Sequence, residues 1–187
     1  MHQKLGLDFE LIRKLRPEYF AKYGTTLKGL QINHGVNPDD YLAFTHQIPL
    51  QNYLHEDKEL HSLLQSLPQV KWVFTNSDAY HAGRVLDILN IRDCFAGIID
   101  IYATGFNCKP DPVAFQTAMA LSGVDDPTSC VFIDDLERNT LAAKKLGFFT
   151  ILVAPNPSSL GNNNIHHIGN IHELTAFPGL WNKTNEG

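Results

Sequence analysis

The chain has 187 residues, of which 43% are hydrophobic, and a formal net charge of −5 at pH 7. This length and composition suit one folded domain, or one domain with a small appendage, and exclude global disorder. The acidic balance argues against nonspecific binding to nucleic acid or to an anionic membrane, and no apolar run approaches the roughly 20 residues of a membrane-spanning helix.

The cysteine content and the N-terminal sequence indicate the cellular compartment in which the protein is expected. The cysteines are Cys94, Cys108 and Cys130, an odd number at wide spacing. Such a set fits neither a disulfide framework nor the spacing of a zinc motif. The N-terminal stretch MHQKLGLDFELIRK has no apolar core of the kind that a signal peptide needs. We therefore expect a reducing, cytoplasmic location.

The first 70 residues predict helices with little strand signal between them. The helical segments are DFELIRKLRPEYFAKYG (8–24), PDDYLAFTHQ (38–47) and DKELHSLLQSL (57–67). Asn37 before Pro38 and two acids is a favourable helix start. We expect a small helical subdomain over residues 1–50 and an α/β domain over residues 51–187.

From residue 71 onward, short apolar runs alternate with helical patterns. Alternation of this kind predicts right-handed crossovers and a mostly parallel sheet. The Pro-, Ser- and Asn-rich run 155–164 predicts a loop. His166 and His167 after it are expected in a solvated loop, with adventitious metal binding as the alternative. The expected strands are 71–75, 96–102, 130–134 and 149–154, and the expected helices are 78–90, 111–123, 137–147 and a short one at 172–177.

Polar residues follow the expected strands where a ligand would bind in such a sheet. Ligands lie at the carboxyl ends of parallel strands. A hydroxyl, an amide, a cation and an acid pair together suit a phosphoryl group and Mg²⁺. Taken singly, Thr75 also fits a plain strand end, Lys109 a solvated surface lysine, and Asp135 a helix cap. The candidate site residues are Thr75, Asn76, Lys109, Asp134 and Asp135.

Three motifs carry a family resemblance. FTNSD (74–78), KPDP (109–112) and FIDD (132–135) stand in this order, and with them the chain resembles the haloacid dehalogenase superfamily over roughly residues 68–154. YGTTLKGL (23–30) and NHGVNPDDYLAFTH (33–46) resemble the helical cap of its pyrimidine 5′-nucleotidase-like members. The resemblance implies a Rossmann-like parallel sheet with a helical cap that closes over the substrate.

The resemblance also implies residue roles and an activity. Thr75 and Asn76 would hold the phosphate through hydroxyl and backbone amide, and Lys109 would neutralise the nucleophile and the phosphate. Asp134, with Asp135 in support, would hold Mg²⁺. The implied reaction is hydrolysis of a small phosphate monoester, most specifically a pyrimidine nucleoside 5′-monophosphate, with phosphoglycolate or another sugar phosphate as the alternative.

One family motif is missing from this sequence. The family's nucleophile and general acid/base come from DxDx[TV] after an N-terminal strand, whereas Asp8, Glu10 and the pair Asp39–Asp40 lie in helical patterns. In family terms the chain begins inside the cap, so we expect a sheet without its first central strand. The two flanking strands would then either pair with each other or leave a gap. Two functions are therefore compatible with the sequence. The protein is either a phosphohydrolase or a noncatalytic phosphate- and Mg²⁺-binding or regulatory protein.

Overall fold

The computed structural model of the chain describes residues 1–155 and 165–181. Helices alone occupy the N-terminal part, and strands alternate with helices from residue 72 onward. The predicted α/β fold with parallel strands is confirmed, because every strand pair in the described residues is parallel. The helices are α1 (His2–Leu5), α2 (Phe9–Tyr23), α3 (Thr26–His34), α4 (Pro38–Thr45), α5 (Lys58–Ser66), α6 (Ala79–Leu89), α7 (Pro112–Ser122) and α8 (Glu137–Lys145). The strands are β1 (Trp72–Phe74), β2 (Gly97–Ile99), β3 (Val131–Asp134), β4 (Phe149–Val153) and β5 (His166–Ile168), and short 3-10 helices include η1 (Leu50–Asn52), η2 (Arg92–Cys94) and η4 (Ile171–Ala176).

The strands of the described residues form two sheets rather than one. β1 pairs with β2, and β3, β4 and β5 form the second sheet in that order. Phe74 at the end of β1 is in register with Ile99, and Asp134 at the end of β3 is in register with Leu152. β1 and β3 are not paired with each other. Of the two arrangements that the sequence leaves open, the structure has the gap.

Aromatic side chains join the two sheets where strand hydrogen bonds do not. Phe74 of β1 and Phe132 of β3 lie 6.3 Å apart between ring centroids. Phe115 of α7 contacts both, at 5.5 Å and 5.2 Å, and is 1% exposed. Edge-to-face contacts of this kind add to the free energy of burial. The sheets are therefore held together by side-chain packing.

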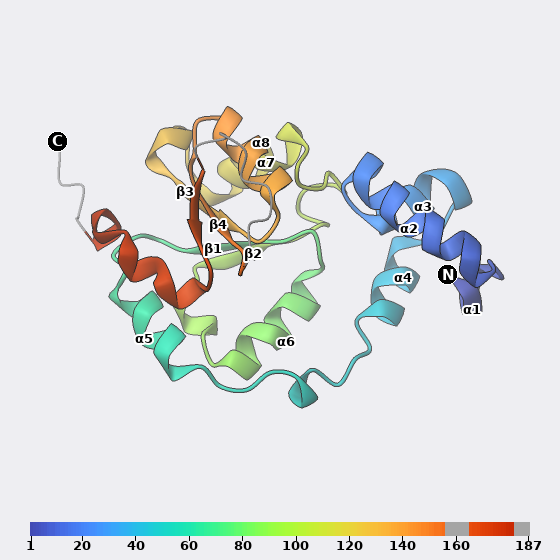
Figure 1. Cartoon of the computed structure of the whole chain (residues 1–187), viewed down its shortest axis with the longest axis horizontal. Coiled ribbons are helices and arrows are strands. Elements are labelled where there is room, and N and C mark those ends of the chain that lie inside the picture. The colour runs from blue at the N-terminus through green and yellow to red at the C-terminus, as the bar shows by residue number, and fades with distance from the viewer. Residues whose placement is uncertain (156–164, 182–187) are drawn as a thin grey trace.

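Each sheet is covered on both faces by helices. Val73 packs into the cluster that contains Leu64 of α5 and Leu86 of α6, whereas Phe74 packs into the cluster of α7 and α8. Neighbouring residues of a strand point to opposite faces, so these two clusters lie on opposite sides of β1. Figure 1 shows α5 and α6 below the strands and α7 and α8 above them.

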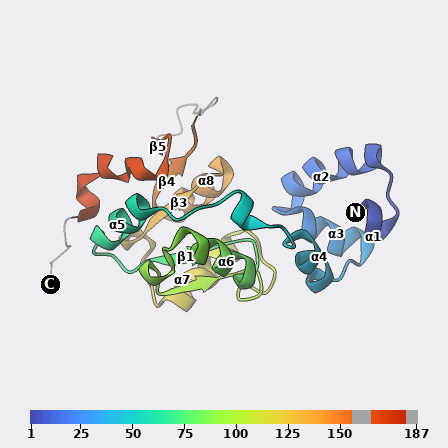
Figure 2. The same cartoon turned by 90° about the horizontal axis from the view of Figure 1, so that it is seen from below.

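Helices α1 to α4 gather at one end of the molecule, apart from the strands, in both Figure 1 and Figure 2. The predicted helix start at Pro38 is confirmed, because the Asn37 side chain accepts hydrogen bonds from the amides of Asp39 and Asp40 at 2.8 and 3.1 Å. Helix α3 was not among the helices predicted from the sequence pattern, although it lies in the stretches that resemble a helical cap; it begins after Thr25, whose hydroxyl caps it. The division at residue 50 stays a prediction. None of the described helices is long and apolar enough to cross a membrane.

The C-terminal part corrects one expectation. His166 and His167 belong to strand β5 and not to a solvated loop. The strand is stabilised by pairing with β4, and the His166 ring stacks on Phe149 with centroids 4.5 Å apart. The expected last helix is present as η4, whose Leu174 is fully buried. The loop expected at 155–164 lies outside the described residues, apart from its first residue.

Candidate active site

Four of the five candidate residues meet at the carboxyl ends of β1 and β3. Thr75 and Asn76 directly follow β1, and Asp134 ends β3. Lys109 lies in the loop before α7, and hydrogen bonds connect it to Asn76 and to Asp134. Because parallel strands end at the same edge, residues far apart in the sequence come together here.

Lys109 connects the two sheets. Its ammonium donates hydrogen bonds to the carbonyl oxygen of Phe74 and to Oδ2 of Asp134, each at 2.7 Å. The residue is only 7% exposed, and its Nζ lies 4.7 Å from the centroid of the Phe74 ring. Lys109 is therefore not a solvated surface lysine. An ammonium carries three N–H groups, so one remains to donate to a bound anion.

Asp134 is a buried and heavily used carboxylate. Besides Lys109, it accepts hydrogen bonds from the amide of Leu136 and from Nδ2 of Asn139, both at 2.9 Å to Oδ1. The residue is 9% exposed. A buried carboxylate is tolerated when it is paired and hydrogen-bonded, and Lys109 supplies the countercharge.

Asp135 differs from its neighbour because it is exposed. It does not cap α8: that helix has no side-chain cap at its N-terminal Leu136, and Asp134 takes the Leu136 amide instead. The helix-cap alternative for Asp135 is therefore wrong. Its outward carboxylate is available to a ligand, and its role as a metal ligand stays a prediction.

Asn76 positions the loop that carries Lys109. Its side-chain Nδ2 donates to the carbonyl of Lys109 at 3.0 Å, and its Oδ1 accepts from the amide of Lys109 at 2.8 Å. The peptide bond from Lys109 to Pro110 is cis. The amide side chain thus fixes the backbone of Lys109 from both sides, a role that the motif alone did not indicate.

Thr75 keeps its hydroxyl proton for a ligand. Its amide donates to the carbonyl of Ile99 at 2.9 Å and so continues the pairing of β1 with β2. Its Oγ1 accepts a hydrogen bond from the amide of Ser77 at 3.0 Å. Accepting does not use the hydroxyl proton, which can donate to an anion at this strand end.

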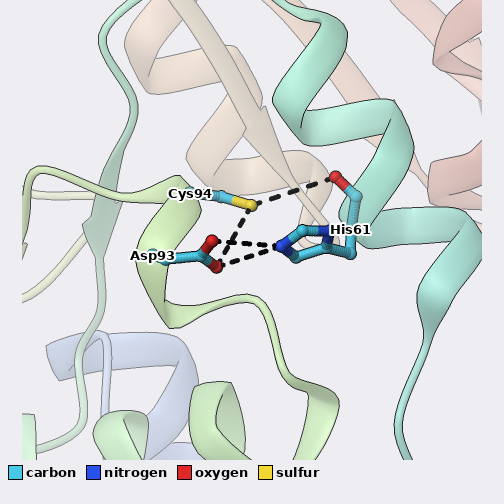
Figure 3. Close-up of side chains that lie close together, drawn as sticks. All are labelled: His61, Asp93 and Cys94. Atoms are coloured by element: carbon cyan, nitrogen blue, oxygen red, sulfur yellow. Dashed lines mark hydrogen bonds and ion pairs between the residues drawn. The ribbon is translucent and has the colours of Figure 1, made fainter.

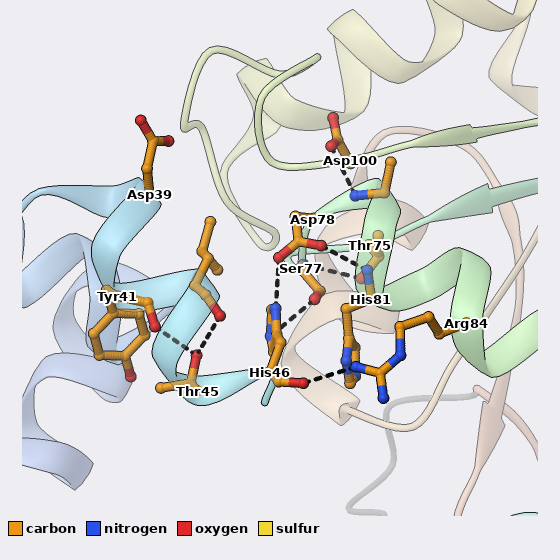
Figure 4. Close-up of polar contacts among 12 residues, drawn as sticks. Asp39, Tyr41, Thr45, His46, Thr75, Ser77, Asp78, His81, Arg84 and Asp100 are labelled. Atoms are coloured by element: carbon orange, nitrogen blue, oxygen red, sulfur yellow. Dashed lines mark hydrogen bonds and ion pairs between the residues drawn. The ribbon is translucent and has the colours of Figure 1, made fainter. Parts of the chain in front are cut away.

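A hydrogen-bonded chain beside Thr75 was not predicted from the sequence (Figure 4). His46, just after α4, faces Ser77 through Nε2 at 3.2 Å and Asp78 through Nδ1 at 2.5 Å. All three lie in stretches that the family resemblance singled out, but nothing in the sequence pairs residues about 30 positions apart. The order Ser–His–Asp resembles that of the catalytic triad of serine hydrolases.

The surroundings of this chain of residues join two helices to the strand-end loop. The amide of Ser77 donates to Thr75, that of Ala79 to Asp100, and that of His81 to Asp78. Through Ser77 and Asp78, His46 links the end of α4 to the start of α6 and to the loop that carries Thr75.

Further contacts tie helices α2 and α3 to the α/β part. Arg138 of α8 donates to the carbonyl oxygens of Phe20 and Gly24, and its guanidinium lies 3.6 Å from the centroid of the Phe20 ring. Lys28 of α3 donates to the carbonyl of Phe106 at 3.0 Å. The group of helices α1 to α4, called the helical group below, is thus hydrogen-bonded to α8 and to the loop before Lys109.

The oxygen atoms near the end of β3 are ligands of the type that a hard cation prefers. Mg²⁺ takes oxygen ligands, often one or two carboxylates, and keeps several waters. Asp135 offers an exposed carboxylate, and Oδ1 of Asn139, next to Asp134, is buried without a hydrogen-bond partner in the described part of the chain. Asp134 is already occupied by three donors. Asp135 is thus the freer of the two predicted ligands.

Comparison with known proteins identifies the family. A sequence model of the family described as haloacid dehalogenase-like hydrolase matches residues 14–147, more than half of the chain. The chain belongs to this family. Phosphate metabolism protein 8 of Saccharomyces cerevisiae (strain ATCC 204508 / S288c) is 37% identical over 160 residues, which cover 77% of this chain. The chain spans about half of that relative, 49% of its length.

Solved structures of haloacid dehalogenase-like proteins have the same fold. The HAD phosphatase from Thermococcus onnurineus aligns with a TM-score of 0.61 at 17% identity, covering 95% of this chain and 84% of that chain. β-Phosphoglucomutase from Clostridium difficile aligns with a TM-score of 0.55 at 20% identity, covering 92% and 75%. The L-2-haloacid dehalogenase from Xanthobacter autotrophicus aligns with a TM-score of 0.55 at 21% identity, covering 78% and 64%. At these identities the likeness shows the fold alone, and it confirms the fold class predicted from the motifs.

Proposed function

We propose that this chain carries the phosphate-binding part of a haloacid dehalogenase-type phosphohydrolase that acts on a small phosphate monoester. The observation that carries the proposal is the position of Lys109, buried between the ends of β1 and β3 with one N–H left for an anion. Thr75 adds a hydroxyl proton at the same edge. A cation and a hydroxyl donor held in a sheltered site suit the charge of a phosphoryl group.

The substrate class that we propose is a pyrimidine nucleoside 5′-monophosphate. Support comes from the stretches 23–30 and 33–46, which resemble the cap of pyrimidine 5′-nucleotidase-like proteins. In the structure these stretches form α3 and α4 and lie in the helical group that is bonded to the loop before Lys109. The similar yeast protein is named for phosphate metabolism, which agrees with a phosphate ester as substrate.

Magnesium is part of the same proposal. Asp135 and Asp134 would hold the ion, and Mg²⁺ would supply positive charge to a bound phosphate. The exposed carboxylate of Asp135 is the ligand that supports this assignment best.

A second candidate function is binding of a phosphate ester and Mg²⁺ without turnover. It is favoured by the carboxylates around the site, since those of Asp78, Asp100 and Asp134 already accept two or more hydrogen bonds each from their own surroundings. A carboxylate engaged in this way is a poor nucleophile. Measurements of turnover and of binding on the same protein separate the two functions.

The test measures phosphate release from UMP and CMP with and without Mg²⁺. AMP and phosphoglycolate are compared as other phosphate esters, and 2-chloropropionate is assayed for halide release. Phosphate release that needs Mg²⁺ and falls about 100-fold in Thr75→Val supports the hydrolase. Thr175→Val, on the exposed face of η4, is the matched control. For the metal, Asp135→Asn is compared with Asp125→Asn, which is also exposed.

Calorimetry with UMP and Mg²⁺ completes the comparison. Binding without phosphate release supports the second candidate. Halide release from 2-chloropropionate without phosphate release contradicts both, and so does the absence of both binding and turnover.

A further inference from the structure

A second group of chemically active side chains lies away from the strand ends, between α5 and η2. His61 of α5 and the neighbours Asp93 and Cys94 of η2 point toward one another (Figure 3). Among the described residues, this is the group of His, Cys, Asp or Glu that could hold a metal ion, with one ligand atom from each residue and all three atoms within 4.8 Å of one another. α5 and η2 carry none of the residues that surround Lys109.

The distances in this group are close to those of a tetrahedral zinc site. Nε2 of His61 lies 3.2 and 3.1 Å from the two carboxylate oxygens of Asp93, and Sγ of Cys94 lies 3.8 Å from Oδ1 of Asp93. Usual Zn–N, Zn–O and Zn–S bond lengths place tetrahedral N and O ligands about 3.3 Å apart, and S and O ligands about 3.5 Å apart. The remaining pair, Nε2 of His61 and Sγ of Cys94, lies within 4.8 Å, so side-chain shifts would bring all three atoms onto one ion.

The charges of the group also favour a cation. A neutral imidazole, a carboxylate and a thiolate together balance the charge of Zn²⁺. Arg92, which precedes Asp93 in the sequence, is paired with Asp87 at 3.0 Å. Gln65 donates to Asp93 at 3.1 Å and holds that carboxylate in place, as partners of metal ligands commonly do.

An ion has access to the group from solvent. The Asp93 side chain is 62% exposed and that of His61 is 32% exposed, whereas Cys94 is buried beneath them. A hollow on the surface, lined by Asp87, Asn90, Arg92 and Asp93, opens beside the group. Asp93 borders both the hollow and the group, so water can reach the group there and complete the coordination of a site with three protein ligands.

We infer that His61, Asp93 and Cys94 bind one Zn²⁺ ion, with a water as fourth ligand, and that the ion clamps α5 to η2. On binding, the Cys94 thiol loses its proton to solvent as the Zn–S bond forms. His61 binds as a neutral ring through Nε2, with its proton on Nδ1. The His, Asp and Cys ligands select a borderline-soft metal over Mg²⁺, which prefers oxygen ligands.

The clamp has a structural consequence. Leu60 and Leu64 of α5 share a buried cluster with Cys94 and with Val73 of β1. An ion that binds the folded arrangement and not the unfolded chain raises the midpoint of thermal unfolding. Zn²⁺ would therefore stabilise the packing of α5 against β1 without taking part in reactions at the strand ends.

The test uses the whole chain, freed of metal with a chelator and titrated with Zn²⁺ against a chromophoric chelator. Co²⁺ substitution serves as a second readout, since a cysteine ligand produces a thiolate-to-cobalt charge-transfer band and a tetrahedral site produces strong visible bands. We expect one tight Zn²⁺ per chain, both kinds of cobalt band, and a higher unfolding midpoint with Zn²⁺.

Three variants and two controls decide the assignment. Cys94→Ser, His61→Gln and Asp93→Asn are expected to weaken Zn²⁺ binding about tenfold or more, and Cys94→Ser to abolish the charge-transfer band. Cys130→Ser and His55→Gln, which change a cysteine and a histidine outside the group, should leave both unchanged. Asp93→Asn alters the most exposed ligand, so it keeps the test valid if Cys94→Ser does not fold. Absence of tight Zn²⁺ binding, equal affinity in Asp93→Asn, or cobalt bands without the thiolate signal overturns the inference.

Discussion

The ammonium of Lys109 and the carboxylate of Asp134 lie 2.7 Å apart at the boundary between two sheets that share no strand pair in the described residues. The same ammonium donates to the carbonyl of Phe74 at the end of β1. One side chain therefore connects the carboxyl ends of β1 and β3. Since both charged groups are buried, the pair matters for stability as well as for ligand binding.

Removing the Lys109 charge should destabilise the fold. In Lys109→Met the Asp134 carboxylate stays buried without its cation, and breaking a buried ion pair in this way costs about 3–5 kcal/mol. The free energy of unfolding in urea measures the loss, which should appear as a lower midpoint at unchanged slope.

A double variant provides the control. Lys109→Met combined with Asp134→Asn removes both charges but keeps an oxygen that accepts from the Leu136 amide. It should be more stable than Lys109→Met alone. If the two variants are equally unstable, the loss comes from packing around Lys109 and not from an unpaired charge.

Asn76→Ala should loosen the loop of Lys109. The change removes two hydrogen bonds to the Lys109 backbone, and leaving these buried groups unpaired costs about 1–3 kcal/mol. We expect lower stability together with weaker binding of inorganic phosphate, measured by calorimetry. Asn52→Ala, at an exposed position of η1, is the matched control. Phosphate affinity unchanged in Asn76→Ala contradicts a role in placing Lys109.

Much of the fold follows from local properties of the sequence. Apolar runs followed by helical periods predicted β1 to β4 and α6 to α8, because these elements depend on their own residues and caps. Strand β5 was missed because three residues have little strand signal alone, and pairing with β4 stabilises them. Helix α3 was missed because it contains Gly29, whose missing side chain leaves room for the Tyr19 ring of α2.

The sequence indicated which candidate residues lie near one another but not how they are bonded. The strand-end rule brought Thr75 and Asp134 to one edge, as observed, and Lys109 joins them from the loop before α7. No sequence rule indicates that Asp134 is already bonded to three donors, or that His46 reaches Ser77. Such contacts depend on how the helical group sits on the α/β part, which is a tertiary property.

Arg138→Met should loosen the attachment of α2. The change removes two charged hydrogen bonds to the carbonyls of Phe20 and Gly24 and a cation–π contact with Phe20. Hydrogen exchange should become faster in α2 and stay unchanged in α5. The control is Arg13→Met on α2 itself, whose exposed ion pair with Glu10 contributes little. Equal exchange in α2 for both variants contradicts the assignment of Arg138 as the attachment.

The His81 ring should make stability depend on pH. Burial lowers its pKa from the usual 6.5, and the neighbouring His46 lowers it further; Asp78 opposes the shift and Arg84 adds to it. Its Nδ1 is also buried without a partner among the described residues. The folded chain therefore binds a proton less readily than the unfolded chain.

The sign of the effect follows from proton linkage. Above pH 6.5 the ring is neutral in both states and its full contribution to stability is present, and this contribution is lost as the pH falls through the lowered pKa of the folded state. We expect the unfolding free energy of the wild type to fall more steeply below pH 6.5 than that of His81→Gln. His55→Gln, at an exposed position, should retain the wild-type slope. Parallel curves for the wild type and His81→Gln would show that another group is responsible.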